Sequence, residues 1–324
     1  MSERYARQTV LPQVGAAGQA RLARGRVLVV GAGGLGCAAL PYLAAAGVGQ
    51  LTLMDPDRVE ESNLHRQPLY RMSDIGMPKV DAARTALLAL NPAIGVTTHR
   101  ERLDAGNAAQ RVGAADVILD AADSLAATYI LSDACRAANL PLVSASVLGL
   151  AGYVGVFCGG APSYRAVFPD MPAQAGSCAA NGVLGSAVGV IGTLQAHLAL
   201  ALLLDLAPSP RGRLISFDFQ SLHVGGFGFT GAAEPVQSQL TFITTAEVGA
   251  ADVVIDLRSL SEAPRSPFPQ ALRLDVESLE RGPAPVPPGA RVVLCCRSGI
   301  RAWRAARALQ RGGHANLALV ALGE

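Results

Sequence analysis

The feature that most constrains this chain is a short β-branched segment followed at once by closely spaced glycines. Residues 26–30 read RVLVV, residues 31–36 read GAGGLG, and an alanine-rich stretch then runs to Gly47. β-Branched residues favour a strand, glycine permits a tight turn, and alanine favours a helix. The pattern therefore predicts a strand, a glycine turn and a helix whose first N–H groups can bind phosphate.

An acidic residue supports a nucleotide-binding role for this turn. The next predicted strand, LTLMD, ends at Asp55, which follows Gly31 by 24 residues. A Rossmann-like unit places the acid that binds a ribose hydroxyl at about this spacing. Strands alternating with helices then predict an α/β fold, a Rossmann-like and mostly parallel sheet with helices on both faces. The further strands are predicted at 117–120, 141–147, 152–157 and 214–219, and the helices at 79–90, 124–138 and 183–206.

A second, smaller unit is predicted at the C-terminal end. Residues 231–239 are small and polar, and we take them as a linker between a domain at 1–230 and a domain at 240–324. Strand patterns at 252–258 and 291–296, followed by a helix pattern, predict that the second domain is also α/β.

Composition excludes several classes of protein. Half of the 324 residues are hydrophobic and 16% are charged, which excludes a disordered or fibrous chain. The net charge of +2 is too small to indicate a nucleic-acid partner. The apolar stretch at 183–206 contains Gln195 and His197, so we interpret it as a buried or dimer-interface helix and not as a membrane span. The six cysteines form no Cys-x-x-Cys pair and no signal peptide is evident, which indicates a reducing, cytoplasmic location.

One lysine stands out among the basic residues. Of the 27 lysines and arginines, only Lys79 is a lysine. The bias indicates that arginine is used wherever either base suffices. Lys79 is therefore predicted to occupy a site that needs a flexible ammonium group.

Five separated motifs carry a family resemblance. They are RYARQ (4–8), GAGGLG with its following acid, SNLHRQ (62–67), GMPK (76–79) and DAAD (120–123). In this order and spacing they resemble the MoeB/ThiF family, the bacterial relatives of ubiquitin-activating enzymes, over residues 3–225. The resemblance implies a homodimer that uses ATP and Mg²⁺ to adenylate the C-terminal glycine of a ubiquitin-like sulfur carrier protein ending in Gly-Gly, as MoaD and ThiS do. Pyrophosphate is the implied leaving group.

The resemblance also implies a role for each matching residue. The nucleophile is a carboxylate that is already ionised, so the site needs cations and a metal more than it needs a general base. The nucleotide site would be formed by the backbone at Gly31, Gly33, Gly34 and Gly36, which phosphates would approach, and by the side chains of Ser62, Asn63, Arg66 and Ser124. Asp55 would bind the ribose, Lys79 would reach the α-phosphate and Asp123 would hold magnesium. Arg7 would reach across a dimer interface to the partner's ATP, and Cys178 would form a thioester or acyl disulfide with the activated carrier.

Two departures from the family pattern are visible. Many members bind a structural zinc ion through two Cys-x-x-Cys pairs, but the first position here reads PSYRA (162–166) and the second lacks cysteine, so we expect no structural zinc. The Asp-x-x-Asp-Asn motif ends in Ser124 in this chain. The identity of the carrier is therefore open.

The segment VVLCCRSGIRAW (292–303) predicts a thiol site between a strand and a helix. N–H groups of the turn and the positive end of the helix would lower the pKa of a thiol there. The segment resembles the loop of rhodanese domains, which implies that Cys296 carries sulfur as a persulfide and that Arg297 and Arg301 form an electropositive rim. An alternative is a Cys-x5-Arg phosphatase that uses Cys295 and Arg301, although Leu294 stands where those enzymes usually have histidine.

Both sites together lead to one hypothesis and two alternatives. We expect the first domain to make a carrier acyl-adenylate and the Cys296 persulfide to convert it to a thiocarboxylate, with a cysteine desulfurase or another sulfur donor as partner. One alternative is an ATP-binding scaffold that docks a sulfur donor. The other is a nicotinamide-dependent oxidoreductase, because a Gly-x-Gly-x-x-Gly turn is common to both classes.

Overall fold

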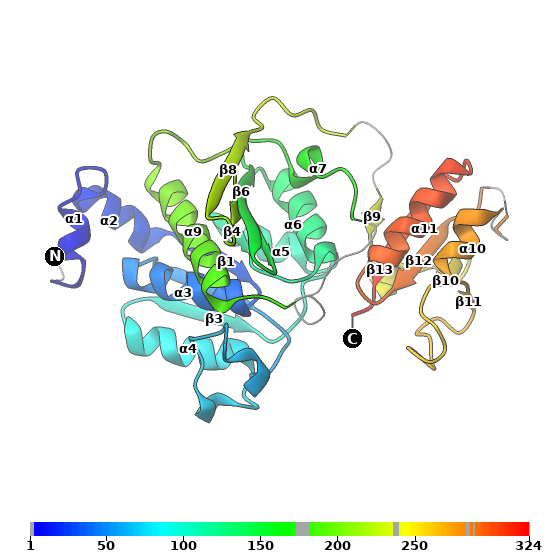
Figure 1. Ribbon diagram of the computed structural model, residues 1–324, viewed down its shortest axis with the longest axis horizontal. Coiled ribbons are helices and arrows are strands. Elements are labelled where there is room, and N and C mark those ends of the chain that lie inside the picture. The colour runs from blue at the N-terminus through cyan, green and yellow to red at the C-terminus, as the bar shows by residue number, and fades with distance from the viewer. Residues whose placement is uncertain (1–2, 173–181, 236–239, 283–285, 288, 324) are drawn as a thin grey trace.

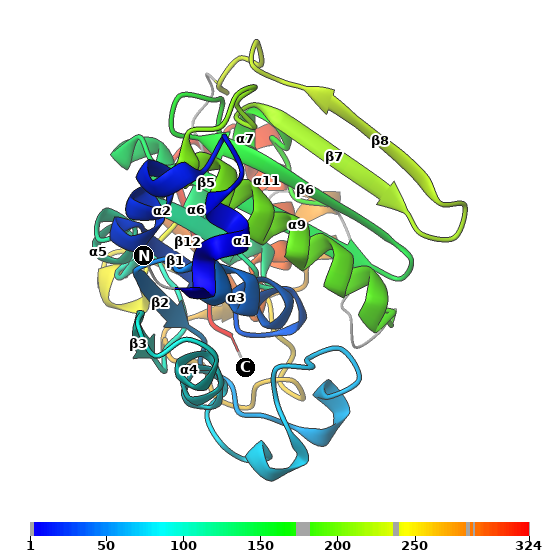
Figure 2. The ribbon, with the colours of Figure 1, turned by 90° about the vertical axis from the view of Figure 1, so that its left-hand side faces the viewer.

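The structure is a computed structural model that describes residues 3–172, 182–235, 240–282, 286–287 and 289–323. Its larger sheet has the strand order β3-β2-β1-β4-β5-β6-β7-β8. The strands are β1 (Arg26–Val30), β2 (Gln50–Met54), β3 (Gly95–His99), β4 (Val117–Asp120), β5 (Pro141–Leu148), β6 (Ala151–Cys158), β7 (Arg213–Asp218) and β8 (His223–Gly228). Strands β1 to β5 are parallel, whereas β6, β7 and β8 pair antiparallel at one edge (Figure 2).

Helices cover both faces of this sheet. The apolar side chains of β1 alternate between the faces: Val27 and Val29 join the core beneath α3, α4 and α9, whereas Leu28 and Val30 join the core beneath α5 and α6. The predicted α/β fold with a mostly parallel sheet is therefore confirmed (Figure 1). The helices are α1 (Ala6–Thr9), α2 (Gly15–Arg24), α3 (Gly34–Ala46), α4 (Lys79–Leu90), α5 (Ala108–Gly113), α6 (Leu125–Ala138), α7 (Tyr164–Val167) and α9 (Gly185–Leu204).

The apolar helix α9 packs within the protein. By length and composition it could cross a membrane, but 61% of its most apolar 18-residue window is buried. Its buried Gln195 donates hydrogen bonds to the carbonyls of Asp120 (2.8 Å) and Val143 (3.3 Å). The polar side chain that argued against a membrane span thus links α9 to the sheet.

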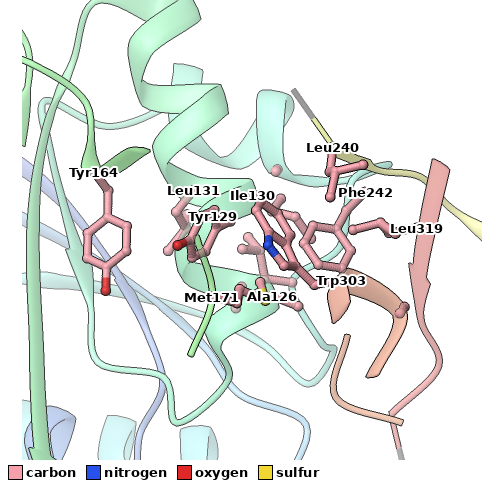
Figure 3. Packing of buried hydrophobic residues seen from close by; sticks show 14 of the residues in the cluster. Ala126, Tyr129, Ile130, Leu131, Tyr164, Met171, Leu240, Phe242, Trp303 and Leu319 are labelled. Atoms are coloured by element: carbon pink, nitrogen blue, oxygen red, sulfur yellow. The ribbon is translucent and has the colours of Figure 1, made fainter. Parts of the chain in front are cut away.

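A second parallel sheet lies towards the C-terminus, with the order β11-β10-β12-β13-β9. Its elements are β9 (Thr241–Phe242), β10 (Val253–Asp256), β11 (Leu272–Arg273), α10 (Val276–Arg281), β12 (Val292–Cys296), α11 (Ile300–Arg311) and β13 (Leu317–Ala321). The two sheets share a core on one face of each, and the opposite face of each sheet has a cluster of its own. One hydrophobic cluster runs from α6 to α11, with Trp303 between Tyr129 and Phe242 (Figure 3). The division at 231–239 stays a prediction, and its residues 236–239 lie outside the described residues.

Most predicted elements lie within two residues of the observed ones, and among those that were not predicted the edge strands β3 and β8 have weak patterns. Strand β3 is partly exposed along most of its length, and β8 (HVGGFG) is rich in glycine and mostly exposed. Neither carries the alternation of apolar and polar residues from which a strand is predicted. β3 and β8 form because they pair with β2 and β7 at the two edges of the sheet.

Candidate functional site

The candidate nucleotide site lies where the strand order of the larger sheet reverses. The last residue of β1, Val30, pairs with Met54 of β2 on one side and with Asp120 of β4 on the other. The segments after these three strands therefore meet at one edge. In open α/β sheets, ligands bind in the crevice outside the carboxyl ends of the strands at such a switch point.

The glycine turn is shaped by close backbone contacts. Gly31 has φ +100°, and a Cβ there would lie 2.4 Å from the carbonyl oxygen of Ala121. A Cβ at Gly36 would lie 2.1 Å from the carbonyl oxygen of Gly31, so glycine lets helix α3 approach the turn. At Gly33 a Cβ would meet only the Gln67 side chain, at 3.8 Å. Gly31 and Gly36 thus serve packing, whereas Gly33 leaves room at the start of α3.

The acid predicted to bind ribose also holds the turn. One oxygen of Asp55 accepts the N–H of Ala32 (2.7 Å) and the other accepts the N–H of Asp57 (2.8 Å). Burial raises the pKa of Asp55, and the positive charge of Lys79 and the two N–H groups oppose that rise. Each carboxylate oxygen retains a further lone pair for a ribose hydroxyl.

The single lysine lies at the start of α4 and is 6% exposed. Its Nζ donates to Oδ2 of Asp57 at 2.7 Å, and its N–H donates to the carbonyl of the same residue at 2.9 Å. The Asp57 side chain is 61% exposed. The Lys79 side chain is thus buried, and its ammonium group lies between the exposed carboxylate of Asp57 and the nucleotide-site residue Asp55.

The SNLHRQ segment brings a cation and a buried amide to the glycine turn. A Cβ at Gly34 would lie 3.8 Å from the Cγ of Arg66, whose Nη1 donates to the carbonyl of Ser62 at 3.2 Å. Gln67 is 2% exposed, and its Oε1 accepts no hydrogen bond. The side-chain amide of Asn63 donates a long hydrogen bond to the Ser62 hydroxyl at 3.4 Å. An unsatisfied buried amide beside an open glycine fits a polar ligand such as ATP.

The loop after β4 carries the predicted metal ligand. Asp123 is exposed, whereas Asp120 is 1% exposed and accepts a hydrogen bond from Ser144 (2.8 Å). Burial raises the pKa of Asp120 to about 6. Ser124 caps helix α6 by accepting the N–H of Ala127 at 3.5 Å. Within the described ranges no three His, Cys, Asp or Glu residues cluster, so a magnesium ion at Asp123 would need phosphate and water oxygens as further ligands.

One predicted site residue, Arg7, is not brought to this edge. Arg7 is exposed on α1, beside the C-terminal end of α3, where Tyr5 packs on Gly47 and Gln8 donates to the carbonyl of Ala46 (3.0 Å). Because α3 rises about 1.5 Å per residue, Arg7 lies roughly 20 Å from the glycine turn of its own chain. Cys178 lies outside the described residues.

The predicted thiol site lies at the end of β12. The Sγ of Cys296 accepts the N–H groups of Gly299 (3.2 Å) and Ala302 (3.4 Å). Cys296 is nevertheless fully buried, and burial raises its pKa despite these contacts. The prediction of a lowered pKa was therefore wrong, because keeping the thiolate away from water outweighs two N–H groups. Cys295 points into the opposite core, beside Phe268, and receives neither contact.

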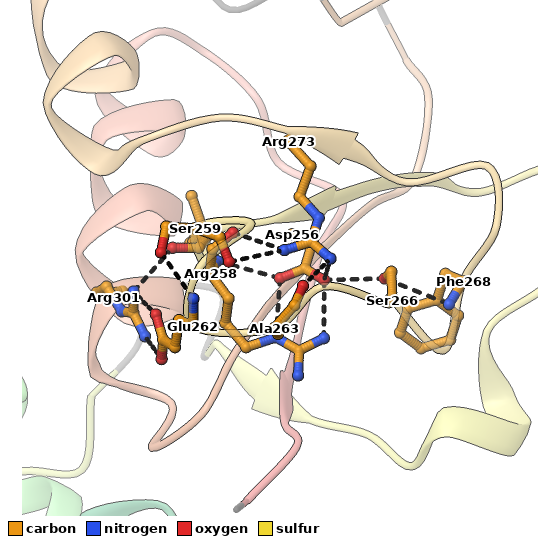
Figure 4. A network of polar contacts seen from close by, with 10 residues as sticks. Asp256, Arg258, Ser259, Glu262, Ala263, Ser266, Phe268, Arg273 and Arg301 are labelled. Atoms are coloured by element: carbon orange, nitrogen blue, oxygen red, sulfur yellow. Dashed lines mark hydrogen bonds and ion pairs between the residues drawn. The ribbon is translucent and has the colours of Figure 1, made fainter.

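An ionic network links Arg301, in the first turn of α11, to the segment that follows β10 (Figure 4). Arg301 forms two hydrogen bonds with Glu262, at 2.7 and 2.5 Å, and donates to the carbonyl of Leu257 at 3.0 Å. Buried Asp256 binds Arg258 through both carboxylate oxygens, at 3.0 and 2.8 Å. Arg301 therefore ties the start of α11 to the segment after β10. Its charge is largely paired with Glu262, so Arg301 is not an unpaired cation at the rim of the thiol site.

The comparisons with known proteins fit this geometry. A model of the ThiF family matches residues 5–234. The chain belongs to the ThiF family. It is 45% identical over 222 residues to "Adenylyltransferase and sulfurtransferase MOCS3" of Drosophila grimshawi, covering 67% of this chain and 49% of that protein. It is 48% identical over 218 residues to the Bos taurus protein of the same name, covering 66% of this chain and 48% of that protein. The match thus spans about half the length of these relatives.

Solved structures share the fold at lower identity. E. coli MccB, crystallised with MccA-N7isoASN, superposes with a TM-score of 0.63 at 21% identity, covering 74% of this chain and 75% of that chain. PaaA superposes with a TM-score of 0.60 at 24% identity, covering 70% and 73%. This likeness confirms the α/β architecture of the ThiF-family chain.

Three residues at the site were not predicted from the sequence. Asp57 binds Lys79, Tyr70 donates to the carbonyl of Ala32 (2.7 Å), and Gln67 is buried beside Gly33. Asp57 had a visible signal, because it follows β2 two residues after Asp55. Gln67 ends the SNLHRQ motif but was assigned no role, and Tyr70 lies in the following loop, whose course only the tertiary structure defines.

Proposed function

We propose that this ThiF-family chain adenylates the C-terminal carboxylate of a ubiquitin-like sulfur carrier protein and then transfers sulfur to it. The observation that carries the proposal is the switch-point edge, where the glycine turn, Asp55 and the Asp123 loop follow the neighbouring strands β1, β2 and β4. Arg66 lies beside Gly34, and Lys79 lies close to Asp55. Support comes from relatives that are named adenylyltransferase and sulfurtransferase. Because this chain spans about half their length, the activity, the carrier and the partners are part of the proposal.

The first step joins two anions. A carboxylate oxygen of the carrier attacks the α-phosphorus of ATP, an acyl-adenylate forms, and pyrophosphate leaves. The N–H groups at the start of α3, the Arg66 guanidinium and the Lys79 ammonium stabilise the phosphate charge. Asp123 is the proposed ligand of Mg²⁺, which neutralises charge on the phosphates.

The second step moves sulfur onto the carrier. Thiosulfate loads Cys296 as a persulfide with release of sulfite, or a cysteine desulfurase hands over the same sulfane sulfur. The terminal persulfide sulfur attacks the acyl carbon, AMP leaves, and an acyl disulfide to Cys296 forms. Two equivalents of a thiol reductant then release the carrier thiocarboxylate and the free Cys296 thiol and are themselves oxidised to a disulfide. The reducing cytoplasm is the proposed location, and the five described cysteines, all unpaired, are compatible with it.

We also propose that the chain works as a homodimer. Arg7 is too far from its own glycine turn to reach it, and α1 exposes the neighbouring Val10 (74%) and Leu11 (50%). The outer side of α9 adds an open apolar groove lined by Val190, Leu194 and Phe217. A second copy seated on these surfaces would cover them and bring its Arg7 to the first copy's nucleotide. Sedimentation velocity tests the dimer, and a monomer at micromolar concentration would contradict it.

Carrier-dependent exchange of pyrophosphate into ATP tests the proposed function. The exchange should require Mg²⁺ and a carrier ending in Gly-Gly, and Asp123→Ala should abolish it. Asp116→Asn is the matched control, because Asp116 lies at the opposite end of β4, paired with Arg26. ATP binding without exchange would indicate a scaffold, and tighter binding of NAD than of ATP would indicate an oxidoreductase. Either result refutes the proposal.

The sulfur step has its own test. Cys296→Ala should retain pyrophosphate exchange and lose thiocarboxylate formation, as measured by mass spectrometry of the carrier. Cys295→Ala is the control, because Cys295 faces the opposite core and has no contact with the loop N–H groups. If Cys295→Ala alone stopped the transfer, the phosphatase-type assignment of the thiol would gain support and the Cys296 assignment would be wrong.

A further inference from the structure

Helices α6 and α11 lie side by side and start at the same end. A Cβ built at Gly299, just before α11, would lie 3.2 Å from the Cβ of Ala126, in the first turn of α6. One turn further along, the rings of Trp303 and Tyr129 have centroids 5.0 Å apart. Both contacts lie in the first turns and progress from N- to C-terminus on both helices, so the two helices start beside each other and extend in the same general direction.

This arrangement brings the two candidate reaction sites together. Asp123 precedes Ala126 by three residues, and the Sγ of Cys296 lies 3.2 Å from the N atom of Gly299. Three extended residues span at most about 11 Å, so Asp123 and the Cys296 sulfur lie within roughly 20 Å of each other. An extended carrier tail of about six residues covers that span.

A buried arginine holds the two helices in this position. Arg165 is 2% exposed, and its guanidinium binds both oxygens of Asp133 on α6, at 2.6 and 2.7 Å. It also donates to the carbonyl of Leu240 at 3.1 Å and lies over the rings of Tyr129 (4.9 Å) and Trp303 (5.4 Å). The Arg165 side chain thus contacts α6, α11 and Leu240, the residue that precedes β9.

A surface carboxylate adds a second link. Asp170 follows α7 and accepts hydrogen bonds from the Trp303 Nε1 (3.2 Å) and the Arg307 Nε (2.5 Å). Its side chain is 60% exposed, so removing it leaves no buried charge unpaired. Asp170 therefore links the segment after α7 to α11, and it can be replaced without leaving a buried charge unpaired.

We propose that Arg165 and Asp170 are positioning residues that keep the Cys296 loop beside the start of α6, so that sulfur passes to the acyl-adenylate within one chain. This inference rests on the proposed function and adds to it the route of transfer. The persulfide sulfur attacks the acyl carbon and AMP leaves, as described above. No second subunit supplies the sulfur.

A heterodimer of two inactive chains tests the route. One chain carries Asp123→Ala and the other Cys296→Ala, and two affinity tags allow purification of the mixed dimer. Transfer within one chain predicts a thiocarboxylate rate below about a tenth of wild type, because neither chain has both groups. Recovery to about half of the wild-type rate would show transfer between subunits and overturn the proposal.

Separate measurements distinguish failure of the route from failure of the function. The Cys296→Ala chain should retain carrier-dependent pyrophosphate exchange, and the Asp123→Ala chain should retain loading of Cys296 by thiosulfate. If wild type itself shows no exchange, the proposed function fails. If exchange and loading persist but the mixed dimer makes thiocarboxylate, only the single-chain route fails.

Asp170→Ala tests the positioning role. An exposed ion pair contributes at most about 1 kcal/mol, which corresponds to a two- to fivefold lower rate of thiocarboxylate formation. Pyrophosphate exchange and thiosulfate loading should be unchanged, which a general loss of structure would not allow. Glu280→Ala is the matched control, because Glu280 of α10 pairs with Arg304 of α11, so both partners of this ion pair belong to the smaller sheet's domain. Equal transfer rates for Asp170→Ala and the control would overturn the positioning role.

Discussion

The buried carboxyl group at the end of β4 should make stability depend on pH. Asp120 is 1% exposed, and hydrogen bonds from the Thr128 and Ser144 hydroxyls and a weak backbone N–H contact oppose the effect of burial only in part. Burial raises its pKa from 3.8 to about 6. The folded protein therefore binds a proton at Asp120 more tightly than the unfolded chain does. This contribution to stability is complete below pH 3.8 and is lost as the pH rises through 6.

The size of the effect follows from the shift. One pKa unit corresponds to about 1.36 kcal/mol, so the full contribution is about 3 kcal/mol. Between pH 7.5 and pH 5.0 the linkage relation gives about 1.4 kcal/mol of added stability at the lower pH. Asp120→Asn removes the titrating group and keeps an acceptor for the Ser144 hydroxyl. The variant should therefore lose this part of the pH dependence.

Urea unfolding followed by circular dichroism at the two pH values measures the difference. The quantity compared is the change in the free energy of unfolding between pH 7.5 and 5.0, wild type against Asp120→Asn. Asp116→Asn is the control, because the hydrogen bond and charge of Arg26 keep the pKa of Asp116 below its ordinary value and the group stays ionised across this range. If Asp120→Asn retained the wild-type pH dependence, the burial argument would be refuted.

Three further predictions concern packing and the thiol. Gly36→Ala should unfold at a lower temperature than wild type, because its Cβ would lie 2.1 Å from the carbonyl oxygen of Gly31. Differential scanning fluorimetry measures the midpoint of thermal unfolding, and an unchanged midpoint would contradict the prediction. Arg165→Met should lower the free energy of unfolding by about 1–2 kcal/mol, because it removes the hydrogen bonds to Asp133 and to the carbonyl of Leu240, while the Asp133 side chain, 36% exposed, can still be solvated; equilibrium denaturation tests this value. In native buffer at pH 7.5, Cys296 should react with iodoacetamide roughly tenfold more slowly than free cysteine, because it is buried and its pKa is raised. Peptide mapping after timed quenching measures the labelling rate, and labelling as fast as that of free cysteine would contradict the prediction.

Two variants separate the effect of the Lys79 charge on activity from the effect of its ion pair with Asp57. Lys79→Met keeps an apolar stem in the buried position and removes the ammonium, so pyrophosphate exchange should fall about 100-fold or more. Asp57→Asn breaks the same ion pair and keeps the ammonium, so it should retain most of the exchange. Equal losses in the two variants would assign the effect to structure and not to the α-phosphate.

The sequence alone determined the local elements and the order of the nucleotide-site motifs. The RVLVV strand, the glycine turn, α3 and Asp55 follow from residues that are neighbours in the chain, and the observed bounds of β1 and α3 agree with the pattern. Strand, turn and helix preferences depend on the nearest residues, which is why a linear pattern can predict them. Family membership followed from the spacing of such local motifs.

Only the tertiary structure decided the properties that depend on burial and on distant partners. The raised pKa of Cys296 results from a core to which α6 and α11 both contribute, although those helices are far apart in the sequence. The pairing of Lys79 with Asp57, the contact of Gly299 with Ala126 and the placement of Arg165 depend in the same way on long-range packing. Desolvation and ion pairing are set by what surrounds a group in space, and the linear order of residues does not contain that information.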